Sequence, residues 1–546
     1  MLKSEIKKNL ALTLVELFGA SDILKFSLIL IFSILYLPHV FVLVEDLGLI
    51  SGYEVDSGSI ISAIEDIIRT YNMHSGFHSK FYGWTYFSIN YIFLIPIKVF
   101  CTLFDIESKF YLYTGIKLIL FAIGLISMVA FYEILRKLFS NKILPFIGCL
   151  FYILSNTGYI FFYFLHPETT GIMFIFFALL CLLKLIENKR DNKSLNYKLY
   201  FYGLIFLVLA SLSKQIFFFI SLPILVLFFH FHSVNEKVKY IDFLVSRKFV
   251  KVLGYSIAIA IGILFVIHPY SILEFKKFLE YQIELGNFFS GAYAVPFDKL
   301  FELWKVRFFS APIIKLSVFL FPISFIVCVA YYLKSKNVKC LLYIANSICI
   351  ILVSCLIIIC NRILFLNGYL QPLYPLFIIN FLSILAFVSN VNLKKFQSFK
   401  VPIIVFFVYF IILSLASSIH SNIPKIFGRL NYKDSTAYLT YNYLKNNIVP
   451  EDKIVYDHFV ALPDSLKSQG CHYWQGCGTD YINEYQPNYV IFNEDYTIND
   501  KKSAESVRLK NYVKEKKLTL VKKLGGASYL DNENKVAISI SIFKKL

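Results

Sequence analysis

Two carboxylates, Glu54 and Asp56, follow the first long apolar run of the chain, Ile23 to Val44. An acidic side chain just outside a membrane segment buries no apolar surface and lies where water meets lipid headgroups. A carboxylate there suits a general base for an acceptor hydroxyl, or a ligand that holds a divalent cation against a leaving phosphate. The alternative is structural, because Asp56 or a neighbouring serine can cap the helix expected over residues 60–69.

A second acidic turn, His166-Pro167-Glu168, stands between two apolar runs. Pro167 suits the first turn of a helix, and Glu168 suits the positive end of that helix dipole. That structural account explains the placement by itself. The functional alternative is a second carboxylate that reaches the same cavity as Asp56, with His166 as a candidate substrate contact.

Cations stand at the ends of later apolar runs. Lys214 interrupts two apolar helices, and Arg362 stands at the end of another, shortly before Tyr369. A cation near a membrane needs an anion, which is either a carboxylate or a lipid phosphate. Snorkelling toward the headgroups is the common alternative for such side chains.

The composition predicts a polytopic α-helical membrane protein. Of the 546 residues 57% are hydrophobic and only 16% are charged. Runs of about 20 apolar residues are long enough to cross a hydrocarbon core. We expect about eleven spans, near residues 23–44, 110–135, 143–164, 168–187, 199–213, 216–232, 252–270, 312–333, 340–361, 369–389 and 401–420.

The basic residues fall mainly between the apolar runs and in the tail. We therefore attribute them to membrane topology and to contacts with anionic lipid headgroups, and we expect no nucleic-acid partner. One more apolar run, Trp84 to Phe104, must be placed. If it lies along the interface, every strongly basic short loop falls on one face, which the positive-inside rule assigns to the cytoplasm. Asp56, Glu168, Lys214 and the tail then share the other face.

The composition after Ser421 changes to that of a soluble domain, so we expect a membrane module over residues 1–420 and a small extracytoplasmic α/β domain over 421–546. Helices are expected over 434–446 and 480–485, and strands over 453–457, 489–492, 518–523 and 536–543. Cys471 and Cys477 are the only cysteines of this part. The pair favours a disulfide in an oxidising compartment, and a metal site is the weaker alternative.

In order along the chain, these motifs resemble the GT-C superfamily of integral-membrane glycosyltransferases. The likeness is strongest to the branch of protein O-mannosyltransferases and of bacterial transferases that put aminoarabinose on lipid A. It rests on Glu54-Val55-Asp56, the aromatic segment 81–87, the span end 135–139, His166-Pro167-Glu168 and the segment 368–375. Two positions depart from the pattern. Ser57 follows Asp56 where many relatives have Glu, and Gly368 precedes Tyr369 where many have Arg.

The resemblance implies that Asp56 is the catalytic carboxylate, as general base or metal ligand, and that Glu168 is the second acid of the cavity. Lys214, Arg362 and Tyr369 would contact the donor phosphate, and Glu54 would take the place of the missing acid. The donor would be a sugar on a polyprenyl phosphate, and the acceptor a lipid, a glycan or a protein. We expect a bacterial inner membrane with the site on its extracytoplasmic face.

Two other functions stay open. A polysaccharide polymerase or ligase that uses undecaprenyl-diphosphate-linked glycans would rely on basic outer loops, and the segment 271–311 carries Lys276, Lys277, Lys299, Lys305 and Arg307. A transporter or flippase would place ionisable residues near the middle of the bilayer and show internal repeats. The charges cluster at span ends instead.

Overall fold

The computed structural model describes most of residues 22–42, 57–70, 83–155, 162–283, 320–359, 371–390, 397–525 and 539–545, with short gaps inside several of these ranges. The chain forms two compact units. The first comprises Met1–Leu37, Met73–Phe93 and Leu118–Ile423, and the second Pro38–Asn72, Leu94–Lys117 and Pro424–Leu546. The expected domain boundary at residue 420 stays a prediction.

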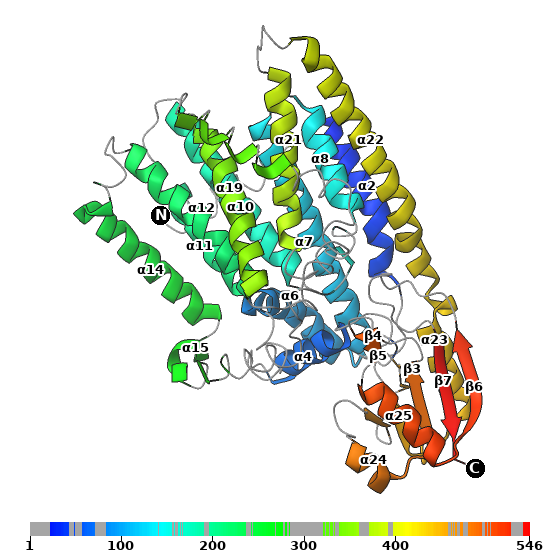
Figure 1. The fold of residues 1–546 in the computed structure, drawn as a ribbon. Helices are drawn as coiled ribbons and strands as arrows, with labels where there is room; N and C mark the ends of the chain where they lie inside the picture. The colour runs from blue at the N-terminus through cyan, green and yellow to red at the C-terminus, as the bar shows by residue number, and fades with distance from the viewer. Residues whose placement is uncertain are drawn as a thin grey trace. The chain divides into compact units, whose positions relative to one another are not determined.

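The first unit is a bundle of apolar helices (Figure 1). The main helices of the first unit are α2 (Ile23–Val40), α7 (Ser108–Leu138), α8 (Ile143–Leu154), α10 (Glu168–Arg190), α11 (Tyr197–Ser213), α12 (Gln215–Asn235), α14 (Arg247–Ile267), α19 (Val338–Ile359), α21 (Tyr374–Asn390) and α22 (Gln397–Gly428). Some of these helices have one end in the second unit. Two short elements, α15 (Tyr270–Leu273) and η1 (Gln371–Leu373), complete its described part.

Within the described residues, seven helices are long and apolar enough to cross a membrane. The expectation of a polytopic helical membrane protein is therefore confirmed, and the number eleven stays a prediction. The run near Trp84 forms one continuous helix, α6 (Trp84–Leu103), whose length and composition also suit a span. Its expected interfacial placement is not tested by these properties. The helix expected over 60–69 is α4 (Ser57–Thr70).

Buried amides join the helices of the first unit. The Nδ2 of Asn346 in α19 donates to Oδ1 of Asn380 in α21 at 2.7 Å, and also to the backbone oxygen of Leu376 at 2.8 Å. In α22, Nδ2 of Asn422 donates to the backbone oxygen of Leu154 at 2.8 Å. Apolar side chains gain little by leaving lipid for a helix interface, so such polar contacts and close packing hold membrane helices together.

A glycine permits the close approach of α11 and α12. A Cβ built on Gly203 would lie 2.2 Å from Cζ of Phe228. Phe228 is fully buried and packs edge-on against Tyr200, with 5.5 Å between the ring centroids, so it has little room to move. Small residues at helix interfaces serve this purpose in membrane proteins.

The second unit contains a five-stranded sheet near the C-terminus, in the order β2-β1-β3-β7-β6 (Figure 1). β1 (Ile454–Tyr456) pairs in parallel with β2 (Gly470–His472) and with β3 (Tyr489–Asn493). β7 (Ser539–Lys544) pairs antiparallel with β3 and with β6 (Thr519–Gly525). A separate two-stranded pair joins β4 (Thr497–Ile498) to β5 (Lys501–Lys502).

Helices cover both faces of this sheet because strand residues alternate between two cores. Tyr489 and Ile491 of β3 pack in one core with Leu444 of α23 (Thr436–Asn447). Val490 and Phe492 pack in the other core with α25 (Ala504–Glu515). The described part of this unit also holds α24 (Thr479–Tyr485) and η3 (Arg429–Asp434). The expected small α/β region is confirmed, while β2, β4, β5 and α25 were not predicted.

The Gly203 contact gives a direct test of this packing. We expect Gly203→Ala to lower the stability of the protein by about 1–3 kcal/mol, because the added methyl group overpacks the α11–α12 interface. Gly254→Ala in α14 is the matched control, since nothing lies within 4 Å of its built Cβ. Thermal unfolding in detergent measures both, and equal behaviour of the two variants would contradict the packing.

Candidate functional site

The structure brings together two of the residues that the sequence singles out, Glu168 and Lys214. Five others lie outside the described residues: Glu54, Asp56, His166, Arg362 and Tyr369. The expectation that Asp56 and Glu168 share one pocket therefore stays a prediction. The observed site is built from the ends of α10, α11 and α12, together with the start of α6.

Glu168 is the first residue of α10. Pro167 precedes it, and the backbone oxygen of Pro167 accepts the N–H of Gly171 at 3.0 Å, which closes the first turn. The structure confirms the helix start that Pro167 and Glu168 predict. At this position the carboxylate faces the positive end of the helix dipole, where a negative charge is stabilised.

Lys214 is the single residue that separates α11 from α12. Its backbone is extended, with φ −164° and ψ 145°, and its oxygen accepts the N–H of Phe217 at 3.0 Å as α12 begins. Lys214 follows the C-terminal end of α11, where the dipole favours a cation, and precedes the N-terminal end of α12, where the dipole opposes one. Gly171 lets α10 approach closely, because a Cβ there would lie 2.2 Å from Cε2 of Phe217.

The ammonium group of Lys214 donates a hydrogen bond to Oε1 of Glu168 and forms an ion pair with it. The Lys214 side chain is 12% exposed and the Glu168 side chain is 2% exposed. Two groups taken this far from water need each other, because an isolated buried charge costs several kcal/mol. Of the two anions expected for Lys214, a carboxylate or a lipid phosphate, the structure shows the carboxylate of Glu168.

The start of α6 packs on the same end of α11. A Cβ built on Gly83 would lie 1.9 Å from the backbone oxygen of Ser213, the neighbour of Lys214. Oγ1 of Thr85 donates to the backbone oxygen of Leu209 at 3.0 Å. The aromatic motif, the acidic turn and the Lys214 break therefore meet at one end of the bundle, although they are far apart in the sequence.

The described residues include no group of three His, Cys, Asp or Glu side chains that could hold a metal ion. The suggested ligand Asp56 is outside that search. The expected disulfide is likewise untested, because Cys477 is not described and only the backbone of Cys471 is, as part of β2.

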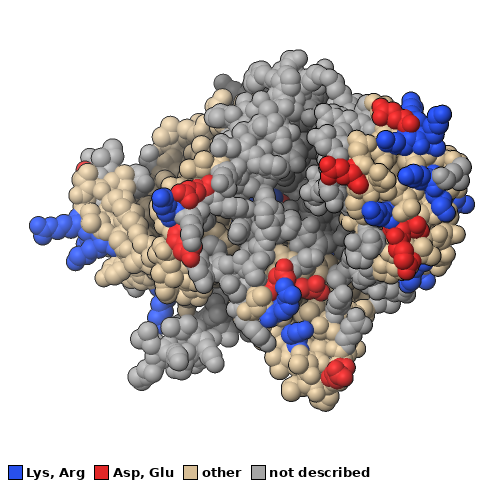
Figure 2. Space-filling model, turned by 90° about the horizontal axis from the view of Figure 1, so that it is seen from below, with Lys and Arg blue, Asp and Glu red and all other residues tan. Residues whose placement is uncertain are grey.

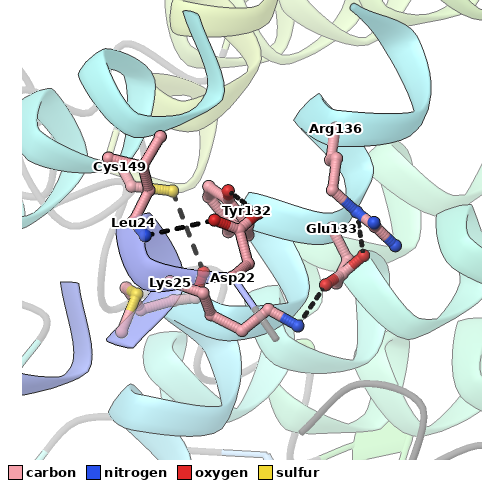
Figure 3. Close-up of polar contacts among 8 residues, drawn as sticks. Asp22, Leu24, Lys25, Tyr132, Glu133, Arg136 and Cys149 are labelled. Carbon is pink, nitrogen blue, oxygen red and sulfur yellow. Dashed lines mark hydrogen bonds and ion pairs between the residues drawn. The ribbon is translucent and has the colours of Figure 1, made fainter. Parts of the chain in front are cut away.

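A second buried cluster of charges joins the start of α2 to the end of α7 (Figure 3). Nζ of Lys25 lies 2.5 Å from Oε1 of Glu133, and these side chains are 8% and 4% exposed. Oε2 of the same carboxylate accepts from Nε of Arg136 at 2.8 Å. Lys25 and Glu133 are ionisable residues inside apolar runs, and this is the signal in the sequence that could have located the cluster.

Asp22 fixes the beginning of α2 in the same cluster. Its Oδ2 accepts from the hydroxyl of Tyr132 at 2.5 Å, and its Oδ1 accepts from the N–H of Leu24 at 3.1 Å. Partial burial opposes ionisation of Asp22. The two hydrogen bonds, with the charges of Lys142 and Lys25, nevertheless hold the pKa of its carboxyl below the ordinary value.

The two clusters lie at opposite ends of α10. Glu168 begins this helix, while Glu187 near its end accepts from Lys137 at 2.7 Å beside the α7 cluster. Nineteen residues of α-helix separate the two carboxylates by about 28 Å along the axis. That length is close to the thickness of a hydrocarbon core of roughly 30 Å.

No family model matches the sequence, and no curated protein matches it. Among solved structures, the chain is similar to ArnT from Cupriavidus metallidurans bound to undecaprenyl phosphate. The TM-score is 0.48 and the identity 10%, over 95% of this chain and 98% of that chain.

The chain is also similar to the oligosaccharyltransferase of Archaeoglobus fulgidus tethered to an acceptor peptide, with a TM-score of 0.44 and 12% identity over 92% of this chain and 74% of that chain. The same enzyme in complex with Zn and sulfate gives 0.44 and 15%, over 86% and 68%.

The α2–α7 cluster predicts unequal effects of its charges on stability. Glu133→Gln removes the carboxylate that pairs with the buried Lys25 and should lower stability by about 3–5 kcal/mol. Arg136→Gln is the control. The Arg136 side chain is 47% exposed, so its loss should cost less than about 1 kcal/mol. The double variant Lys25→Met with Glu133→Leu should recover most of the loss. Thermal unfolding in detergent compares them, and a tolerated Glu133→Gln would contradict the arrangement.

The lowered pKa of Asp22 predicts that the stability of the protein depends on pH. Its pKa is lowered by folding, so its contribution is complete above the unfolded value of about 3.9 and is lost as the pH falls through the folded value. We expect the stability gap between the wild type and Asp22→Asn to be constant near neutrality and to close in acid. A gap that persists unchanged well below a pH of about 3.9, in a protein that is still folded there, would refute this assignment.

Proposed function

We propose that the protein is a glycosyltransferase that moves a sugar from a polyprenyl-phosphate-linked donor to a lipid, glycan or protein acceptor. The observation that carries the proposal is the buried Glu168–Lys214 pair, which lies where three motifs meet at one end of the bundle. A cation at the end of membrane helices, oriented by a carboxylate, suits the phosphate of a donor that arrives by diffusion within the membrane.

The extracytoplasmic side of a bacterial inner membrane is the proposed place of the reaction. Arg136, Lys137 and Lys142 stand in or beside the α7 cluster, at the opposite end of α10 from Glu168. The positive-inside rule favours the cytoplasm for that basic end. Glu168 and Lys214 then belong to the other face of the membrane.

The proposed reaction exchanges one bond for another at the anomeric carbon of the sugar. The bond from this carbon to the donor phosphate oxygen breaks, and a bond to the acceptor oxygen forms. The carboxylate of Asp56 takes the proton of the acceptor hydroxyl as general base, the role that the sequence resemblance implies. The phosphate leaves with the bonding electrons and gains negative charge.

Lys214 stabilises that leaving charge in this scheme. Its ammonium group is already desolvated and held by Glu168, so little reorganisation is needed when the phosphate appears. Glu168 serves as a positioning residue, because its hydrogen bond fixes the direction of Lys214. Arg362 and Tyr369 are further proposed contacts to the phosphate. A divalent ion stays a candidate at Asp56, and no step of this scheme depends on it.

Complementation in cells tests this function. In a deletion strain of the host, the wild-type protein should restore a sugar on a surface glycan, lipid or protein that mass analysis detects. Asp56→Asn should abolish the product, Lys214→Gln should lower it at least about tenfold, and Lys214→Arg should retain part of it.

Lys198→Gln is the matched control, because this lysine is exposed near the start of α11. Membrane abundance of every variant is measured in parallel, so that loss of product is separated from loss of protein. Full activity of Asp56→Asn would refute the assigned base. Transport of a substrate without any glycosylated product would favour a transporter.

A further inference from the structure

Five exposed lysines gather around the turn that joins α25 to β6 in the C-terminal part of the chain. The segment contains one acidic residue, Glu515, and none of the five is ion-paired to another residue that the structure describes. Figure 2 shows Lys and Arg side chains toward the right of the view, with Asp and Glu side chains among them. We name this surface the basic edge, and it consists of Lys514, Lys516, Lys517, Lys522 and Lys523.

The turn itself retains a lysine where the backbone prefers glycine. Lys517 has a left-handed conformation, with φ 52°. The N–H of Leu518 donates to the oxygen of Val513 at 3.0 Å, and the N–H of Lys517 to that of Lys514 at 3.1 Å. This pattern is the Schellman motif, whose left-handed position is usually glycine. A lysine there gives up conformational stability and adds a charge to the basic edge.

The lysines flank apolar side chains on an edge strand. β6 is an edge strand of the sheet, and its side chains Leu520 and Val521 are 48% and 37% exposed. No aromatic residue occurs between Lys514 and Gly525. Lysines around exposed aliphatic side chains are typical of surfaces that bind a membrane interface, whereas single-stranded nucleic acids are bound by stacking on aromatic rings.

A short connection joins the C-terminal sheet to an apolar helix in the sequence. The apolar helix α22 ends at Gly428, η3 follows directly, and α23 of the C-terminal sheet begins at Thr436. A domain tethered this closely meets lipid headgroups at high effective concentration. Weak contacts that would not recruit a free protein are then sufficient.

We propose that the basic edge binds the phosphate groups of anionic lipids in the membrane that carries the chain. Each lysine near an anionic surface contributes roughly fivefold to such binding. Leu520 and Val521 enter the headgroup region between the charges. The interaction orients the C-terminal domain on the membrane and does not depend on the proposed glycosyl transfer.

A structural role for the same lysines makes a different prediction. Charged residues on an edge strand prevent two sheets from pairing at their edges. In that case the lysines stay in water whatever the lipid, and their removal promotes aggregation. The response to lipid composition therefore separates the two roles.

The experiment uses the full chain in nanodiscs of phosphatidylcholine alone or mixed with phosphatidylglycerol. A water-soluble acetylating reagent modifies exposed lysines, and mass spectrometry gives the rate for each peptide. We expect labelling of the basic edge to slow several-fold when phosphatidylglycerol is present and to recover in high salt. Lys445 on α23 is the internal reference, because it is exposed and lies outside the basic edge.

Three variants make the result specific. With Lys516, Lys522 and Lys523 changed to Gln, the remaining lysines of the edge should lose their lipid-dependent protection, whereas Lys445→Gln should leave it intact. Lys517→Gly should raise the unfolding temperature yet weaken the protection. Equal labelling in both lipids would overturn the proposal, and so would protection that persists in detergent without anionic lipid.

Discussion

The hydrogen-bonded ion pair between Glu168 and Lys214 is the interaction on which the site depends. It ties the first residue of α10 to the single extended residue between α11 and α12. The dipole of α10 favours the carboxylate at its start, and the close contacts at Gly171 and Gly83 keep neighbouring backbones near the pair. Because two desolvated charges tolerate separation poorly, the pair fixes the geometry of this end of the bundle.

Buried charges also join the helices at the other end of the bundle. Lys25, Glu133 and Arg136 join α2 to α7, and Asp22 begins α2 by accepting from Tyr132. The charges of both clusters are satisfied within the protein, about one membrane thickness apart along α10. This spacing agrees with helices that are long enough to span a membrane.

Much of the architecture followed from local patterns in the sequence. Apolar length located the helices, and Pro167 with Glu168 predicted the start of α10, because those signals act within one turn. The pairing of Glu168 with Lys214 was one of two open alternatives, since the anion that meets a cation depends on how distant helices pack. Lys25 and Glu133 were missed although both interrupt apolar runs. Short strands such as β2 carry too few residues for a period to show.

Binding of undecaprenyl phosphate to the purified protein tests the central claim most directly, because this probe carries the phosphate but no sugar. The account predicts that Lys214→Gln weakens the affinity at least about tenfold, while Lys198→Gln binds as the wild type does. Unchanged affinity of Lys214→Gln in a protein that is folded, as judged by its unfolding temperature, would contradict the claim that this lysine meets the donor phosphate.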